Sequence, residues 1–146
     1  MGTAGRNHVN AFLPAESGTS AVEFALLSPL YFLLMMGIAA YGIYFGVSHS
    51  LQQVAADAAR TAIAGLSAEE RRQLAARYVA LNAGTYPLID MRHLRVETGD
   101  SEGDPTQFVV ELDYDALSLP IWNLFDGLPL PPVVISRAST IRIGGI

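Results

Sequence analysis

The sequence contains no cysteine and no lysine. Without cysteine, the chain cannot form a disulfide framework, offer a thiol nucleophile or build a cysteine-based zinc site. All nine basic residues are arginine, and the excess of acidic residues gives a formal net charge of −5. Nucleic-acid binding requires a basic face, which this balance does not favour. The composition therefore argues against nucleic acid as a partner.

Formal charge is also missing from a long stretch of the chain, because no Asp, Glu, Lys or Arg occurs from Phe24 to Ala56. As a helix, the apolar run Phe24–Val47 would be about 36 Å long at ~1.5 Å per residue, which is enough to cross a bilayer. Hydrophobic residues make up 51% of the chain, a high share for a soluble domain. We therefore expect a transmembrane helix, although its flanking charges set no orientation.

The pattern predicts three parts: a leader peptide at 1–18, a transmembrane and stalk helix at 19–66, and a small head domain at 67–146. The helix is expected to continue past the membrane and to end near Gly65. Beyond the membrane its apolar positions recur every three or four residues, at Leu51, Val54, Ala58 and Ala62.

A second helix is predicted to begin at Ser67–Glu70, which has the pattern of a capping box. In such a box the serine side chain and the glutamate side chain each accept a bond from a free N–H group of the first turn. The apolar face of this helix is expected to consist of Leu74, Tyr78 and Leu81.

Three strands are predicted from alternating apolar and polar residues, at 94–97, 108–115 and 133–143. The polar turn Gly99–Pro105 separates the first two. In the third, the alternation slips near Arg137, which suggests a bulge. The predicted fold class is α+β, with a long N-terminal transmembrane helix extending into a stalk, a second helix and a small three-stranded antiparallel sheet.

A glycine and a carboxylate precede the apolar run. Glu23 is the fifth residue after Gly18, small residues lie between them, and Phe24 follows. A carboxylate costs roughly 2.5–3.5 kcal/mol at the bilayer centre and less at its edge. The helix dipole could favour Glu23 by up to ~1 kcal/mol, with Ser17 or Thr19 as an ordinary N-cap. That interpretation explains the carboxylate but not the glycine, the small residues and the apolar run together.

The run Gly18–Pro29 resembles the class III prepilin cleavage site of the type IV pilin superfamily, in the form found in TadE-like minor pseudopilins of tight-adherence (Flp/Tad) pilus systems. The resemblance implies a processing site formed by Gly18, Thr19, Glu23 and Phe24, which a membrane aspartyl prepilin peptidase cuts after the glycine. It also implies that the new amine of Thr19 pairs with Glu23 of a neighbouring subunit. In a low dielectric this pairing satisfies two charges and sets the axial register between subunits.

By this resemblance the protein is expected to be a minor pseudopilin that takes part in initiation or assembly of a Tad (Flp) type IV pilus, and not an enzyme. The implied partners are the prepilin peptidase, a second TadE/TadF-like pseudopilin, the major Flp pilin, the inner-membrane assembly platform and membrane lipid. The implied location is the inner (cytoplasmic) membrane, single-pass, with the C-terminal head in the periplasm; entry into the pilus is left open. The alternative is an uncleaved single-pass envelope-binding protein or an accessory subunit of another export complex.

Three positions in the apolar helix bear on its packing. Pro29 predicts a kink, and Ser28 could satisfy a carbonyl that the proline leaves free. Gly42 and Gly46 form a G-x-x-x-G pair, which lets helices approach closely in lipid. The pair predicts packing against other helices or against the head of the same chain, and both interpretations remain open.

The segment 117–132 combines large apolar residues with four prolines, which predicts an extended loop. Such a loop must either cover the sheet or meet something outside, and the outside candidates are a second pilin and the membrane surface. The interpretations are closely balanced. We predict that Trp122 and Phe125 form a partner surface.

No motif in the chain indicates catalysis, a metal or a cofactor. Four carboxylates have the spacing of a calcium loop, but Pro105 occupies the position that requires glycine, so a hairpin turn is the better interpretation. These carboxylates are Asp100, Glu102, Asp104 and Glu111. The histidines are scattered over leader, stalk and first strand, at His8, His49 and His93. We expect no catalytic residue, no metal and no cofactor.

Overall fold

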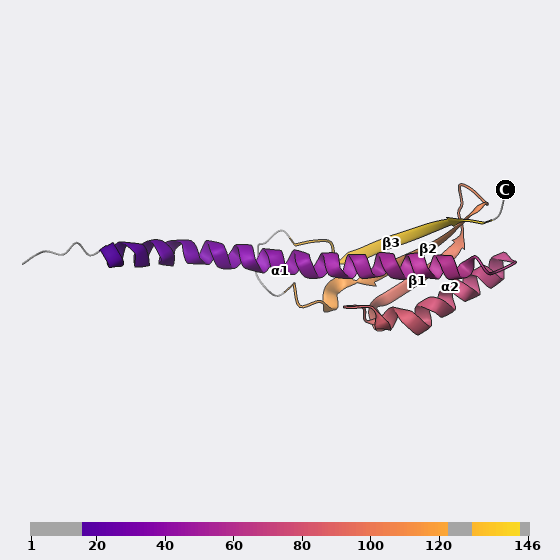
Figure 1. The fold of residues 1–146 in the computed structure, drawn as a ribbon, viewed down its shortest axis with the longest axis horizontal. Helices are drawn as coiled ribbons and strands as arrows, with labels where there is room; N and C mark the ends of the chain where they lie inside the picture. The colour runs from indigo at the N-terminus through magenta and orange to yellow at the C-terminus, as the bar shows by residue number, and fades with distance from the viewer. Residues whose placement is uncertain (1–15, 123–129, 144–146) are drawn as a thin grey trace, which may run out of the picture. The chain divides into compact units, whose positions relative to one another are not determined.

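The computed structural model describes residues 16–122 and 130–143 (Figure 1). Two helices come first, α1 (Glu16–Ala62) and α2 (Ala68–Asn82), and three strands follow: β1 (Leu94–Asp100), β2 (Gln107–Asp115) and β3 (Val134–Arg142). Short 3₁₀ turns connect them at η1 (Ala83–Thr85), η2 (Met91–His93) and η3 (Ala116–Ser118). The strands form one antiparallel sheet in the order β1-β2-β3. The expected α+β fold is confirmed.

The chain divides into two compact units, residues 1–35 and 36–146. The second, which we call the C-terminal unit, contains the last part of α1 with α2 and the whole sheet. One face of α1 between Ala40 and Ala62 is buried in the same core as the strands. Of the leader expected at 1–18, residues 1–15 lie outside the described residues.

The helix α1 ends at Ala62, close to the expected terminus, and the backbone N–H of Gly65 bonds the Ala62 carbonyl at 3.0 Å. Gly65 is buried, and a Cβ atom there would lie 2.7 Å from the backbone nitrogen of Arg71. Only glycine fits so close to another backbone, which explains why the chain can turn from α1 into α2 at this point.

The serine half of the expected capping box opens α2, whereas Glu70 bonds the N–H of Leu66 and not that of the N-cap residue Ser67. The Ser67 hydroxyl accepts a bond from the Glu70 N–H at 3.1 Å, and the Glu70 carboxylate accepts one from the Leu66 N–H at 2.9 Å. The buried face of α2 was predicted less well, since Ala75 and Val79 are fully buried while Leu81 is 68% exposed. Two residues beyond Val79, a side chain points to nearly the opposite side of a helix, so the expectation for Leu81 was wrong.

The core lies between one face of the sheet and the two helices. Figure 1 shows α2 returning alongside the C-terminal part of α1. Alternate residues of β2 are buried, as predicted, at Phe108, Val110, Leu112 and Tyr114. The α1 side of the core is made of the fully buried residues Val47, Leu51, Val54, Ala55, Ala58, Ala59 and Ala62. Burying one large apolar side chain contributes roughly 1.5–3 kcal/mol to the free energy of folding. The C-terminal part of α1, from Val47 to Ala62, is therefore a major part of the core.

The bulge predicted near Arg137 is wrong, because β3 pairs with β2 in one unbroken register from Val134↔Asp115 to Arg142↔Gln107. Arg137 lies on the covered face of the sheet, in line with Ile135. Its guanidinium reaches the hydroxyl of Ser48 on α1. Because Arg137 is polar but lies on the inner face, it interrupts the alternation of apolar and polar residues without any bulge in the strand.

Candidate functional site

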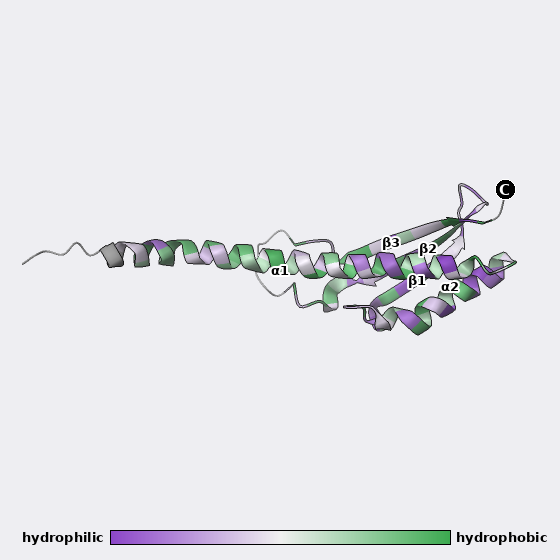
Figure 2. Ribbon diagram, in the orientation of Figure 1, coloured by the Kyte–Doolittle hydropathy of each residue, from purple (hydrophilic) through white to green (hydrophobic). Residues whose placement is uncertain are grey.

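Large apolar side chains cover the N-terminal part of α1 and face outward on all its sides. Phe24 is 68% exposed and Leu26 is 80% exposed, and the exposed apolar surface continues to Phe45. The segment Thr19–Ala62 is long and apolar enough to cross a membrane, and its most apolar window is not buried by the protein. Figure 2 shows polar positions becoming frequent only in the C-terminal part of α1. A helix that is apolar all round and uncovered suits a lipid environment.

The Gly18–Thr19 bond lies in α1, close to the first described residue, Glu16. Glu23 is exposed one turn further along. The pairing expected for Glu23 concerns a second subunit and stays a prediction.

The side chain of Ser28 compensates in part for the proline at position 29 of the helix. Proline lacks an N–H group, so the carbonyl four residues earlier, that of Ala25, loses its helical donor. The hydroxyl of Ser28 donates to this Ala25 carbonyl at 3.2 Å. The bond that the Ser-Pro pair suggested is thus present, and it replaces part of the hydrogen bonding that the proline removes.

The two glycines of the G-x-x-x-G pair differ in their surroundings. At Gly42, no described atom lies within 4 Å of where a Cβ would be. At Gly46, a Cβ would lie 3.2 Å from Cδ1 of Leu88, a residue with the unusual positive φ of 66°. Gly46 therefore packs against the loop of its own unit, while the described residues leave the helix surface at Gly42 open.

A hydrogen-bonded group that the sequence did not reveal joins α1 to the segment after α2. The Tyr86 hydroxyl donates to the Asp57 carboxylate at 2.8 Å and lies 3.0 Å from the Tyr78 hydroxyl, while Arg60 bonds Asp57 at 3.0 Å. The hydrogen bond with Tyr78, burial and the bond with Asp57, in that order, raise the pKa of Tyr86. The phenol therefore stays protonated and holds Asp57, the first formal charge after the apolar run, in place.

The described part of the apolar loop contributes to the core. Ile121 is fully buried and Leu119 is 8% exposed, whereas Leu117 is 62% exposed. Trp122 is half-buried, packs against the core, and its indole N–H donates to the Ala116 carbonyl. Phe125 lies outside the described residues. Ile121 thus covers the core, and the partner role of Trp122 and Phe125 remains a proposal.

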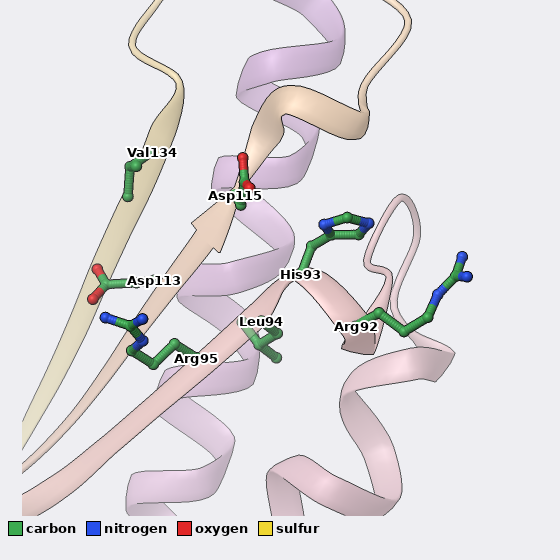
Figure 3. A pocket seen from close by; sticks show the side chains of 7 residues that line it. All are labelled: Arg92, His93, Leu94, Arg95, Asp113, Asp115 and Val134. Atoms are coloured by element: carbon green, nitrogen blue, oxygen red, sulfur yellow. The ribbon is translucent and has the colours of Figure 1, made fainter.

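A pocket of about 460 Å³ lies at the outer face of the sheet and contains both signs of charge (Figure 3). Its lining residues are Arg92, His93, Leu94, Arg95, Asp113, Asp115 and Val134. No hydroxyl or thiol nucleophile is among them. Asp90 bonds the Arg92 guanidinium at 2.7 Å, and this bond lowers the pKa of Asp90 to about 2. Within the described ranges, no group of three His, Asp or Glu residues is placed to hold a metal ion.

In the turn between β1 and β2, the carboxylate of Asp104 has a structural role. Asp104 accepts bonds from the Thr106 hydroxyl at 2.6 Å, the Thr106 N–H at 2.9 Å and the Gln107 amide at 3.0 Å. These bonds, the hydroxyl bond first, lower the pKa of Asp104. The carboxylate closes the turn, in agreement with the hairpin interpretation.

Comparison with known proteins identifies the N-terminal part of the chain. Residues 18–60 match the family model described as TadE-like protein. This segment is similar to TadE-like proteins. The resemblance expected from the Gly18–Pro29 run is confirmed, and the TadE-like segment extends through the helix half that forms the core. Neither the curated proteins nor the solved structures contained a match to the chain.

Proposed function

We propose that the protein is a minor pseudopilin that takes part in initiation or assembly of a Tad (Flp) type IV pilus, and that it has no catalytic role of its own. The observation that carries the proposal is the coincidence of two features in one segment. The TadE-like match begins at Gly18, and the same segment contains the uncovered apolar surface of α1. Such a surface requires lipid or other apolar helices around it.

The first step in this function is removal of residues 1–18 by a prepilin peptidase. The family match supports this step, because it begins at Gly18. Glycine lowers helix stability by ~1 kcal/mol relative to alanine, which makes unwinding at this position easier. The peptide bond after Gly18 can therefore be opened out for a peptidase without disturbing the core, which begins at Ala40.

Cleavage would give Thr19 a positively charged amine. Glu23 lies four residues away, about 6 Å along the helix axis at ~1.5 Å per residue. Pairing of the amine with Glu23 of a neighbouring chain would stagger adjacent helices by about this distance and neutralise both charges in lipid. Pairing within one chain is the competing outcome, because residues four apart share a helix face.

The remaining parts of the proposal concern location and partners. α1 would anchor the protein in the inner membrane as a single pass, with the C-terminal unit in the periplasm. A second TadE/TadF-like pseudopilin, the major Flp pilin and the assembly platform would meet the helix there. The open surface at Gly42 supports helix contacts, because small residues let a second helix approach closely.

The proposal is tested by the mass of the mature protein. Co-expressed with its cognate peptidase, the chain should lose residues 1–18 and begin at Thr19. Gly18→Arg should remain full-length, because a bulky cation cannot enter a site shaped for glycine, whereas the control Gly18→Ala should still be cut, more slowly. Full-length wild-type protein in the presence of active peptidase would contradict the proposal and favour the uncleaved anchored protein.

A further inference from the structure

A groove of about 470 Å³ lies between α1 and the free edge of β3. Its lining residues are Phe45, Ser48, His49, Gln52 and Arg137. Four of them are on consecutive turns of the same helix, and the fifth comes from the strand. None of them is acidic, so the one formal charge among the lining residues is positive, in a chain whose net charge is −5.

The cation in this groove pairs with no carboxylate of the described residues. Arg137 is half-buried on the covered face of the sheet, and it donates to the Ser48 hydroxyl and, at 2.6 Å, to the Ser136 carbonyl. None of the ion pairs among the described residues includes it. A guanidinium has further N–H donors in a planar fork that suits the oxygens of a carboxylate or phosphate. A charge partly removed from water is stabilised by an anion that takes those donors.

The neighbouring polar groups add donors to the same place. Ser48 is 4% exposed and its hydroxyl accepts from Arg137, which leaves the hydroxyl proton to be donated. The Gln52 amide donates to the Ala138 carbonyl at 3.2 Å, which leaves it a second N–H. His49 is held by Gln53, 2.8 Å away. The groove therefore offers an anion one charge and at least two hydroxyl or amide donors.

The position of the groove along α1 indicates which anion it would take. Phe45, at one end of it, is 61% exposed and continues the uncovered apolar surface of the helix. Val47 is the last residue of the apolar run, and Ser48 follows directly. If α1 spans the membrane as proposed above, this is the depth at which acyl chains give way to headgroups.

We infer that this groove binds the phosphate of a membrane phospholipid, with Arg137 as its main contact and the acyl chains lying along Phe45. The inference rests on the proposed membrane anchoring. Free inorganic phosphate would use the same donors but would leave the exposed surface of the Phe45 ring uncovered. The bound lipid would fix the C-terminal unit at the membrane surface through β3.

The test is native mass spectrometry of the full-length protein in mild detergent, titrated with phosphatidylglycerol. Arg137→Gln should weaken retention of one lipid about tenfold, the effect of losing one charge-assisted contact. Arg142→Gln, a cation on the exposed face of the same strand, is the control and should bind as wild type does. Equal affinity of the Arg137 variant and wild type would overturn the inference.

Arg137 also bonds β3 to α1, so loss of binding in Arg137→Gln could come from misfolding. A second variant separates the two causes. Gln52→Glu keeps Arg137 and gives it a carboxylate in the groove, so the same tenfold loss is expected in a folded protein. Unchanged binding in this variant would count against the groove. Displacement of the lipid by excess inorganic phosphate would show a free-anion site and overturn the lipid assignment. Failure of the anchoring proposal is seen separately, as release of wild-type protein from membranes by alkaline carbonate.

Discussion

Replacing Leu51 with alanine tests whether the C-terminal part of α1 belongs to the core of the C-terminal unit. Leu51 is fully buried and is among its largest buried side chains. Truncating a buried leucine costs about 2–5 kcal/mol, because apolar contact is lost and a cavity remains. A domain of this size has a free energy of unfolding of only about 5–15 kcal/mol, so the loss is a large fraction of its stability.

The matched control is Leu81→Ala in α2, where the sequence alone predicted a buried position and the structure places a side chain that is 68% exposed. An exposed truncation of this kind changes stability by about 0.5 kcal/mol or less. At this domain size, 1 kcal/mol lowers the melting temperature by roughly 4 °C. We therefore expect Leu51→Ala to melt roughly 8–20 °C below wild type, and Leu81→Ala within about 2 °C of it.

The assay is thermal unfolding of the full-length protein in detergent micelles, followed by near-ultraviolet circular dichroism. This signal reports aromatic residues in the core, such as Tyr114, whereas far-ultraviolet signal would be dominated by α1 held in the micelle. Equal melting of Leu51→Ala and wild type would refute the placement of α1 in the core, as would an equally large effect of Leu81→Ala.

By the same reasoning, a fragment beginning at Gln52 should fail to fold, while one beginning at Met36 should retain the core.

Three further outcomes are expected. Glu23→Ala should still be cleaved but assemble poorly, since removing one partner of a buried ion pair costs about 3–5 kcal/mol; crosslinked complexes at wild-type yield would show another role for Glu23. Trp122→Ala should lower the melting temperature, because the half-buried indole packs against the core; an unchanged melt with loss of partner capture would instead support a partner surface. The Asp90 carboxyl should titrate near pH 2, and Arg92→Gln should return it toward 3.8. Because this pKa is lowered on folding, stability from the Asp90–Arg92 contact is complete above about pH 4 and is lost as the pH falls through about 2. Carboxyl-carbon NMR measures the titration of Asp90, and a titration midpoint near 3.8 in wild type would show that the contact is absent.

The features that the sequence determined by itself depend on residues close together along the chain. The chargeless run predicts an apolar helix, strict alternation predicts β2, Ser67–Glu70 predicts the start of α2, and the Ser28-Pro29 pair predicts its own hydrogen bond. Each follows from local periodicity or from a bond that spans about one turn. The resemblance of Gly18–Pro29 to TadE-like proteins is local for the same reason, since its residues are contiguous.

What only the tertiary structure decided depends on groups far apart in the sequence. Asp57 and Tyr86 are 29 positions apart, and Ser48 and Arg137 are 89 apart, so neither contact leaves a local signal. The same is true of Gly46, which differs from Gly42 only because Leu88 packs against it. A small residue, or a polar one on an apolar face, is compatible with several environments. Which one it occupies is settled by the element that packs on it.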